Sequence, residues 1–440
     1  MSKSHRNKVV IGIAALSFLA PLKFTEAAVL HHLTPWPSGL ANWIFQPWPI
    51  VVFHVLWVML LAAAVMVAGK ESWSIRWGWM PLGFLVAQCF STGASVDATT
   101  SGSVLGLFFS LAAAFWLGAR MIRDRNDLDW LAFGWLAAGV LVTASGLIQL
   151  SVGFEAMERM VREHPSTTAQ QTDLLHRLEM KRIFATFTSP NALGAWAAAA
   201  LFIGGWWCWN AEGASERRGR RIVGAAMSAA LFFCLWKSQS RASLAVFVIL
   251  ASAAFIWSTR RSLLTLLVPS VICFGLLTIF YLWHGHGSVV EWFETSGSSR
   301  LAYYKAAAHI GCEHPLLGTG PGTFQAMYPR YKSPEAEETR LVHNNYLQMW
   351  SDSGLPGFVT FALWLPGTLL LWLRRWRLAP SRERISPLLI WCACAVFALH
   401  SLVDYDLYMA GNSWPIFVLL GYLSQSEPTA AGNTRPNKIP

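Results

Sequence analysis

Charged side chains are scarce in this 440-residue sequence. Asp, Glu, Lys and Arg together make up 13% of the residues, whereas soluble domains carry roughly 25%, so the composition excludes an ordinary soluble fold. Cysteine is rare too, and its seven copies fall mostly inside apolar runs. The sequence therefore predicts neither a disulfide framework nor a cysteine-rich metal site. It also lacks internal repeats, and only the polar tail, residues 426–440, is predicted to be disordered.

Long apolar runs, in contrast, recur along the whole chain. Apolar residues account for 54% of the sequence, and many of the 24 tryptophans lie near the ends of these runs, as is typical of membrane interfaces. Because a helix satisfies its own backbone hydrogen bonds in lipid, each run predicts a transmembrane helix. The twelve predicted spans are 9–29, 48–69, 76–92, 102–121, 129–151, 189–209, 221–238, 242–259, 262–283, 346–373, 385–402 and 413–425.

The charges of the connecting segments alternate between two sides. One set, which includes both termini, holds 21 Lys/Arg and 8 Asp/Glu, and the rest of the chain holds 13 and 16. Because a Lys/Arg excess marks the cytoplasmic side, both termini are predicted to be cytoplasmic. This topology also accounts for the net charge of +10 without nucleic acid. The basic start before the apolar stretch 9–20 resembles a signal peptide, but we expect it to be retained as the first span.

Two long extracytoplasmic loops divide the chain. Residues 1–283 hold spans one to nine and include the first loop, 153–188. Residues 284–342 form the second loop, a predicted helical cap with a helix near 299–310. Residues 343–425 hold spans ten to twelve, and 426–440 form a cytoplasmic tail. Because long loops are uncommon unless functional, we expect the working site on this side.

Arginines stand out among the residues that flank the predicted spans. Arg241 lies in a very short turn between two apolar helices, where an ionisable group is costly. It either snorkels to the interface or binds an anion, since guanidinium pairs bidentately with phosphate. Arg182 and Arg300 are ordinary loop arginines when taken singly. Three arginines on one side of the membrane together favour an anionic ligand.

The histidines have competing interpretations. His343 either caps a helix or acts as a general base, because imidazole titrates near neutral pH. His400 and Asp404 are four residues apart, which favours a structural hydrogen bond between them. The pair His31 and His32 fits a surface location. The segment 318–322, Gly-Thr-Gly-Pro-Gly, is predicted to be a tight turn rather than a phosphate loop, because proline removes an amide donor.

Several motifs resemble the O-antigen ligase and polymerase superfamily over residues 180–412. The strongest is His343-Asn344, nine residues, then Gly354-Leu355-Pro356-Gly357, at the end of the large loop. Ser240-Arg241-Ala242 resembles the family's Ser-Arg-Gly/Ala turn. Arg182 to Asn191 resembles its Arg…Thr-Phe-x-x-Pro-Asn stretch, although Ala185 stands where glycine is usual. Arg300, Tyr304 and the segment 314–318 resemble the opening of the family's loop.

The resemblance implies an all-α protein of twelve spans in the bacterial inner membrane, with a periplasmic cap and active site. It implies a metal-independent glycosyltransferase that needs no cofactor and takes a glycan from an undecaprenyl-diphosphate carrier. Carried over residue by residue, Arg241, Arg300 and Arg182 hold the diphosphate and His343 is catalytic. The supporting residues are Asn344, Tyr304, Gly354, Gly357, His400 and Asp404.

Family members differ in their acceptor. The segment 400–406 resembles members of exopolysaccharide assembly, so we favour a repeat-unit polymerase, whose acceptor is a carrier-linked glycan, over a ligase that uses lipid A-core. Other polysaccharide-assembly proteins are further candidate partners. An anion or glycan transporter is the alternative from another class, but the sequence lacks the repeats and paired broken helices typical of transporters.

Overall fold

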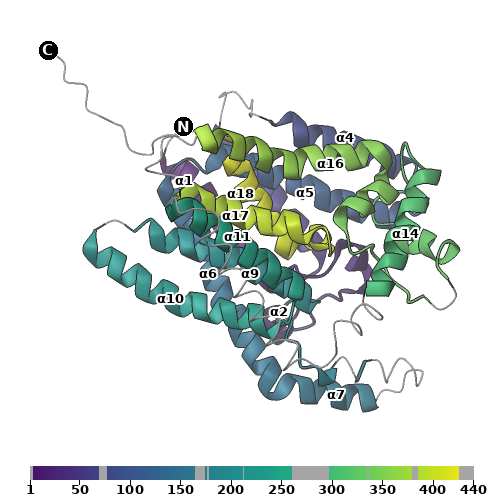
Figure 1. The fold of residues 1–440 in the computed structure, drawn as a ribbon, viewed down its shortest axis with the longest axis horizontal. Coiled ribbons are helices and arrows are strands. Elements are labelled where there is room, and N and C mark those ends of the chain that lie inside the picture. Colours follow the sequence, from purple (N-terminus) through teal and green to yellow (C-terminus); the bar gives the residue numbers. More distant parts are fainter. Residues whose placement is uncertain are drawn as a thin grey trace.

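The chain folds into helices joined by turns. The computed structural model describes residues 3–68, 77–163, 174–175, 178–211, 213–259, 297–333, 336–378 and 385–425, and in these ranges extended pairing is confined to an isolated antiparallel bridge between Ala27 and Met409. Most helices run roughly side by side as a bundle, while α14 stands across one end of it (Figure 1).

The helices follow in chain order. They are α1 (Lys3–Lys23), η1 (Ala28–Leu33), α2 (Leu40–Phe45), α3 (Ile50–Ala68), α4 (Trp79–Gly93), α5 (Ala98–Met121), α6 (Arg125–Ile148), η2 (Gln149–Gly153), α7 (Phe154–Glu163), α9 (Pro190–Trp209), α10 (Ala214–Lys237), α11 (Arg241–Thr259), α14 (Ser298–Glu313), α15 (Phe324–Met327), η4 (Tyr328–Arg330), α16 (Asn345–Leu378), α17 (Ile385–His400), η6 (Asp406–Tyr408) and α18 (Ala410–Gln425).

The all-helical architecture is confirmed, and every predicted span except 262–283 overlaps a helix. The span 262–283 lies outside the described residues. Within the described part of the chain, six helices are long and apolar enough to cross a membrane, which makes this a multi-pass membrane protein. They are Ile50–Ala68, Ala98–Met121, Arg125–Glu163, Pro190–Trp209, Ala214–Lys237 and Asn345–Arg377. The twelve-span count stays a prediction.

One helix begins well before its predicted span. Residues 214–220, which precede the predicted span 221–238, form the first turns of α10. The reason is local, because Arg and Glu are good helix formers. Arg220 also pairs with Glu216, four residues before it, at 2.8 Å, and such pairs stabilise a helix.

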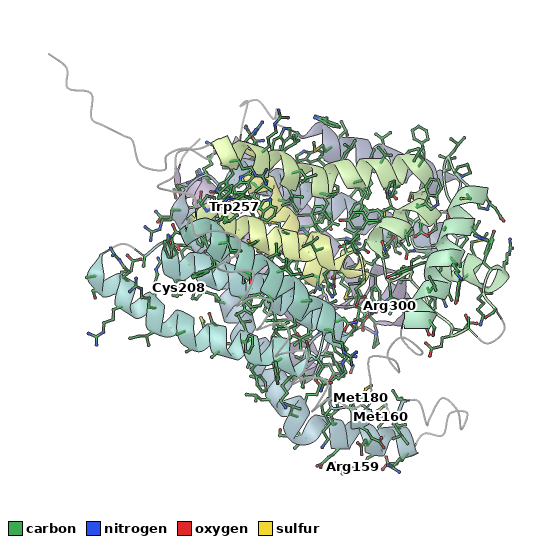
Figure 2. The ribbon with its side chains drawn as sticks, viewed as in Figure 1. Arg159, Met160, Met180, Cys208, Trp257 and Arg300 are labelled. Atoms are coloured by element: carbon green, nitrogen blue, oxygen red, sulfur yellow. The ribbon has the colours of Figure 1, made fainter. Side chains whose placement is uncertain are left out.

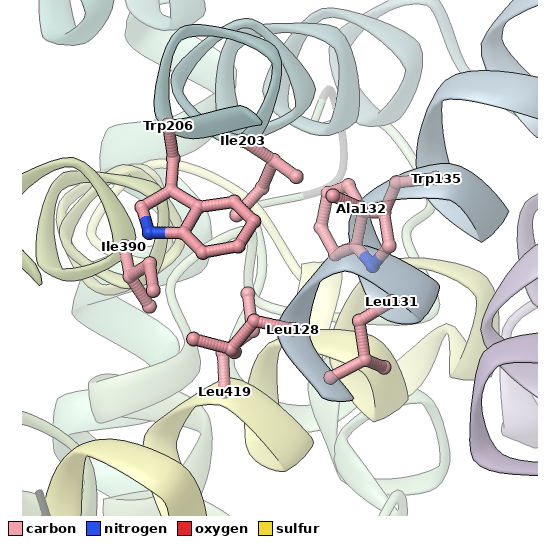
Figure 3. Close-up of a pocket in the computed structure, with 8 residues that line it drawn as sticks. All are labelled: Leu128, Leu131, Ala132, Trp135, Ile203, Trp206, Ile390 and Leu419. Atoms are coloured by element: carbon pink, nitrogen blue, oxygen red, sulfur yellow. The ribbon is translucent and has the colours of Figure 1, made fainter. Parts of the chain in front are cut away.

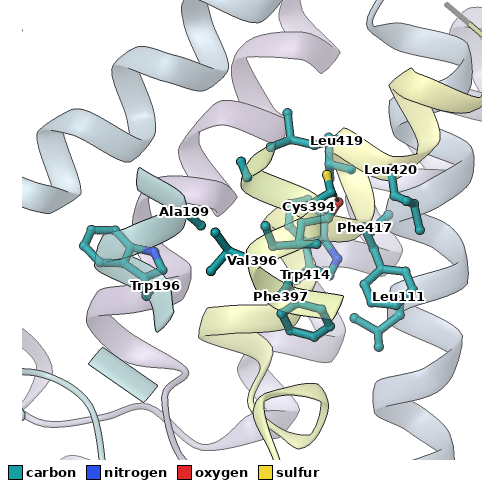
Figure 4. Close-up of a cluster of buried hydrophobic side chains, with 14 of the residues drawn as sticks. Leu111, Trp196, Ala199, Cys394, Val396, Phe397, Trp414, Phe417, Leu419 and Leu420 are labelled. Atoms are coloured by element: carbon teal, nitrogen blue, oxygen red, sulfur yellow. Dashed lines mark hydrogen bonds between the residues drawn. The ribbon is translucent and has the colours of Figure 1, made fainter. Parts of the chain in front are cut away.

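The bundle centre is close-packed and apolar. Figure 4 shows buried side chains of α5, α9, α17 and α18 interdigitating around Trp414 and Phe417. Two glycines let α5 and α18 approach backbone to backbone. A Cβ at Gly118 would lie 1.9 Å from the carbonyl oxygen of Val418, and one at Gly421 would lie equally close to that of Phe115. Small residues at such contacts favour tight helix packing in lipid.

The two ends of the bundle differ in chemistry. At one end, arginines of α1 and α10 are neutralised by carboxylates of α6: Arg6 contacts Asp127 at 2.5 Å, and Arg220 contacts Asp129 at 2.6 Å. The helices α9 and α10 then run to the opposite end, where the candidate site lies. Between the ends lies a void of about 10 Å³, and the side chains that line it are apolar (Figure 3). It is at most large enough for one water molecule and therefore too small for a substrate.

Candidate active site

Arg182 is fixed against the turn that joins α10 to α11. Its Nε donates to the carbonyl of Ser238 at 3.1 Å, and its Nη2 donates to Oδ1 of Asn191 at 3.0 Å. Arg241 is the first residue of α11 and therefore directly follows the same turn. Two of the three predicted phosphate-binding arginines therefore belong to adjoining segments. Two of the N–H donors of Arg182 are already hydrogen-bonded to Ser238 and Asn191.

The turn itself is compact because its residues are small and polar. Gln239 adopts a positive φ of 52°, and the hydroxyls of Ser240 and Ser243 lie 2.8 Å apart. Gly194 of α9 makes room for them, because a Cβ there would be 2.7 Å from Cβ of Ser240. The turn is thus packed directly on the start of α9, and it holds the N-terminus of α11 at the end of the bundle.

The segment before α9 is hydrogen-bonded to the start of η2, directly after α6. Gln149 accepts hydrogen bonds from the backbone N–H groups of Phe184 and Ala185, both at 3.0 Å. Ala185 has φ of 53°, a conformation that favours glycine. This accounts for the glycine that resembling sequences carry at the position, and it makes Ala185 a strained residue in this chain.

His343 lies at the entrance of α16. Its Nδ1 is 3.2 Å from Oδ1 of Asp404, and its φ is 57°. The imidazole stacks on Tyr303 at 6.0 Å between centroids and meets the edge of Tyr405 at 4.7 Å. The ring is partly exposed, while Asp404 is buried. The backbone, two aromatic rings and a carboxylate therefore fix one face of the imidazole and leave Nε2 for another partner.

Asp404 is the electrostatic centre of this cluster. Burial alone would raise the pKa of its carboxyl group, but the hydrogen bond to His343 and the nearby charges of His343, His400 and Arg300 hold that pKa well below its usual range. Arg300 lies near the start of α14 (Figure 2). One turn on, the Tyr304 hydroxyl lies 3.1 Å from the carbonyl oxygen of His343. The structure thus brings Arg300, Tyr304, His343 and Asp404 together.

The predicted hydrogen bond between His400 and Asp404 forms between backbone atoms, because the N–H of Asp404 donates to the carbonyl of His400 at 3.0 Å. Nδ1 of His400 bonds to Oδ2 of Asp406. The two side chains do not pair with each other, because α17 ends at His400 and, after the turn at residues 401–403, the carboxylate of Asp404 contacts His343. Asn412 of α18 then donates to Asp406 at 2.9 Å and to the carbonyl of Ala192 at 3.1 Å. Asn412 therefore links the cluster of His400 and Asp406 to the start of α9, where Ala192 follows Asn191, the hydrogen-bond partner of Arg182.

Three supporting residues have clear local roles. Asn344 caps α16, because its Oδ1 accepts from the N–H groups of Tyr346 and Leu347, both at 3.0 Å. Gly354 has φ of 62° and ψ of −165° inside α16, a region open almost only to glycine. At Gly357, a Cβ would lie 3.2 Å from Nε2 of Gln88 in α4, so this glycine allows close contact between α16 and α4.

Sequence reasoning missed Asp352. This carboxylate is fully buried in α16 and accepts from the N–H of Gly322 and from Nε2 of Gln348, both at 2.7 Å. The hydroxyl of Tyr408 lies 3.3 Å away. An ionisable residue within an apolar span was the available signal. The described residues contain no group of three or more His, Cys, Asp or Glu side chains that could hold a metal ion.

Long apolar helices with a cluster of arginine, histidine and carboxylate side chains at one end define a multi-pass membrane protein with a polar site. Residues 225–362 match the family model described as O-antigen ligase. Over this segment, which contains Arg241, Arg300 and His343, the chain is similar to the O-antigen ligase family, and the predicted resemblance is confirmed. The match implies a glycosyltransferase-type enzyme for lipid-linked glycans. No curated protein matches the chain.

Proposed function

We propose that this protein polymerises O-antigen or exopolysaccharide repeats by transferring a glycan from undecaprenyl diphosphate to a hydroxyl of an acceptor glycan. The observation that carries the proposal is the contact between His343 and Asp404, which lies within electrostatic reach of Arg300. A base and a fixed cation beside each other are what such a transfer needs.

His343 acts as the general base. The ionised Asp404 accepts a hydrogen bond from Nδ1–H of His343, so Nε2 keeps its lone pair and takes the proton of the acceptor hydroxyl. The acceptor oxygen forms a bond to the anomeric carbon as the bond from that carbon to the phosphate oxygen breaks. The electron pair leaves with the diphosphate, and the anomeric configuration inverts. Asp404 orients the imidazole and stabilises its protonated form, as carboxylates do in other histidine-based sites.

Arginines stabilise the leaving diphosphate. Arg300 and Arg241 are the principal phosphate-binding residues, since guanidinium is always charged and binds two oxygens at once. Arg182 is a weaker member, because two of its donors already hold Ser238 and Asn191. With the negative charge met by arginines, the reaction is proposed to proceed without a metal ion.

The topology belongs to the same proposal. Twelve spans, cytoplasmic termini and a periplasmic site follow from the apolar runs and the Lys/Arg distribution. The residues that make up the site lie at the end of the bundle opposite the neutralised arginines Arg6 and Arg220. Division into residues 1–283, the cap 284–342 and residues 343–425 is proposed on the same grounds.

Reconstitution tests the reaction. Purified protein in liposomes receives an undecaprenyl-diphosphate-linked repeat, and product length is measured. We expect His343→Ala to abolish transfer, while His309→Ala, an exposed histidine of α14, keeps it. Arg241→Lys should fail nearly as badly as Arg241→Ala, because a lysine loses bidentate binding. Normal products from the His343 variant would refute the base, and inhibition by a chelator that divalent metal reverses would refute the metal-free reaction.

Deletion of the gene separates the polymerase from the ligase. Loss of polymerisation leaves single-repeat products, whereas loss of ligation leaves long chains on the carrier and none on lipid A-core. If the protein is a transporter, the purified protein will catalyse neither polymerisation nor ligation and will instead move glycan across the liposome membrane.

A further inference from the structure

The helix α16 is interrupted at Gly354, whose φ of 62° and ψ of −165° are not helical. An interruption leaves backbone N–H and C=O groups without partners in their own helix. In lipid, such groups must find other partners within the protein. The turn at the end of α14 supplies them here.

Hydrogen bonds join this turn to both sides of the interruption. Gly320 N–H donates to the carbonyl of Asp352 at 2.8 Å, and Leu355 N–H donates to the carbonyl of Pro315 at 2.7 Å. The side chain of Asp352 also accepts from Gly322 N–H at 2.7 Å. The segment 315–322 therefore completes the backbone of α16 where the helix breaks, and its position relative to α16 is fixed.

The same segment exposes leucines beside the interruption. The exposed fractions are 72% for Leu316, 40% for Leu317 and 51% for Leu355. Along α16, the exposed apolar residues continue at Val359 and Leu363. A spacing of four places Leu355 and these two on one helix face, the face that a membrane helix turns to lipid. Leu316 and Leu317 extend this face beyond the helix.

The length of α16 places these leucines at the edge of the hydrocarbon. The exposed Arg374 marks the other end of the apolar face. At 1.5 Å per residue, the stretch from Leu355 to Arg374 is roughly 28 Å long, close to the ~30 Å of a hydrocarbon core. A Cβ on Gly354 would lie 2.7 Å from the carbonyl carbon of Leu316, so Leu316 sits at the same depth as Leu355.

We propose that Pro315, Leu316 and Leu317 form a membrane anchor of the cap, inserted at the lipid interface on the side of the candidate site. Glu313 and His314, directly before this segment, are exposed. The insertion is therefore shallow: the leucines lie below the lipid headgroups, and Glu313 and His314 lie among the headgroups. The occupant of this apolar surface is lipid, because it is continuous with the lipid-facing side of α16. The anchor requires a membrane-spanning α16 and does not depend on the transfer reaction.

Nitroxide labels measure this insertion directly. A cysteine for labelling replaces Leu316 or Leu317 in a parent protein in which the exposed Cys89 and Cys312 are changed to serine. The parent protein without the added cysteine, treated with the same label, gives the background signal. In liposomes, frequent collision of the label with oxygen indicates a lipid environment, and frequent collision with a water-soluble nickel chelate indicates exposure to water. Leu363→Cys serves as the lipid reference and Gln325→Cys, exposed on α15, as the water reference. We expect both leucine positions to favour oxygen, like Leu363→Cys.

Two outcomes would overturn the anchor. Nickel accessibility at Leu316→Cys equal to that at Gln325→Cys would place the turn in water. Protection from both reagents would place a protein, such as a second copy of the chain, over the leucines. Asp352→Ala in the labelled Leu316→Cys protein adds a test of the joint, because the oxygen that accepts from Gly322 N–H is lost. We expect higher nickel accessibility, and an unchanged signal would show that Asp352 does not hold the anchor.

Discussion

Gly354→Ala tests the joint between the cap and α16. The new Cβ would meet backbone atoms rather than a flexible side chain, with the carbonyl carbon of Leu316 and the carbonyl oxygen of Pro315 both 2.7 Å away. The backbone at this position also has φ of 62° and ψ of −165°, a conformation that residues other than glycine rarely adopt. The cap segment must therefore move away, and the hydrogen bond from Leu355 N–H to Pro315 breaks.

The magnitude follows from these two effects. A non-glycine residue in this backbone region costs roughly 1–3 kcal/mol. Leaving the buried groups of the lost hydrogen bond without partners adds roughly 1–3 kcal/mol. We therefore expect Gly354→Ala to destabilise the protein by about 2–6 kcal/mol, an effect large enough to reduce the yield of folded protein.

Heating in detergent followed by size-exclusion chromatography measures the surviving folded fraction. The matched control is Gly367→Ala in the same helix, where a Cβ would meet only the carbonyl oxygen of Ala362 at 3.4 Å. There we expect an unchanged or slightly higher melting temperature, because alanine favours a helix over glycine by roughly 0.5–1 kcal/mol. Equal melting of the Gly354→Ala and Gly367→Ala proteins would refute the proposed joint.

Three further variants test local features. Ala185→Gly should stabilise the protein by about 1 kcal/mol, because it relieves a positive φ; an unchanged or lower melting temperature contradicts this. Arg6→Ala should destabilise it by about 3–5 kcal/mol, since it leaves the buried Asp127 without its arginine, and wild-type melting would show the pair to be dispensable. Asn344→Ala removes the cap of α16 and should cost about 1 kcal/mol, measured in the same assay.

The bundle was predictable because lipid imposes a simple rule. A long apolar run must be helical, so the helices α3, α5 and α9 could be placed to within a few residues. The arginine and histidine positions were predictable as candidates because charges beside apolar runs are costly. Contacts between residues far apart in sequence were not, since neither charge nor spacing specifies them.

The pairing of His343 with Asp404 was not predicted. A spacing of four predicted a hydrogen bond between His400 and Asp404, and this bond joins their backbone atoms while their side chains bind other partners. Because α17 ends at His400, Asp404 is free to reach a histidine 61 positions away. Asp352 was missed for a related reason, because its partner Gly322 lies 30 positions earlier in the chain, in the segment that packs on the helix break. Helix ends and interruptions decide these contacts, and they are the features that sequence patterns locate least well.

Asp404→Asn separates the orientation of His343 from its presence. The amide keeps the shape of the carboxylate but loses its charge, and it no longer selects the imidazole tautomer with the proton on Nδ1. We expect kcat to fall by about 10²–10⁴-fold with little change in KM. The control is Asp129→Asn, because that carboxylate pairs with Arg220 at the opposite end of the bundle and should leave kcat unchanged.

The same variant has a stability signature that depends on pH. Since the folded protein lowers the pKa of Asp404, its carboxylate stabilises the protein at pH values above the ordinary carboxyl pKa of about 3.9. This contribution is lost as the pH falls through the lowered value. Wild-type protein should therefore melt above Asp404→Asn at neutral pH, and the gap should close only under strongly acid conditions. A gap that grows as the pH falls would show that Asp404 is protonated in the folded protein, and the proposed base would then lack its orienting charge.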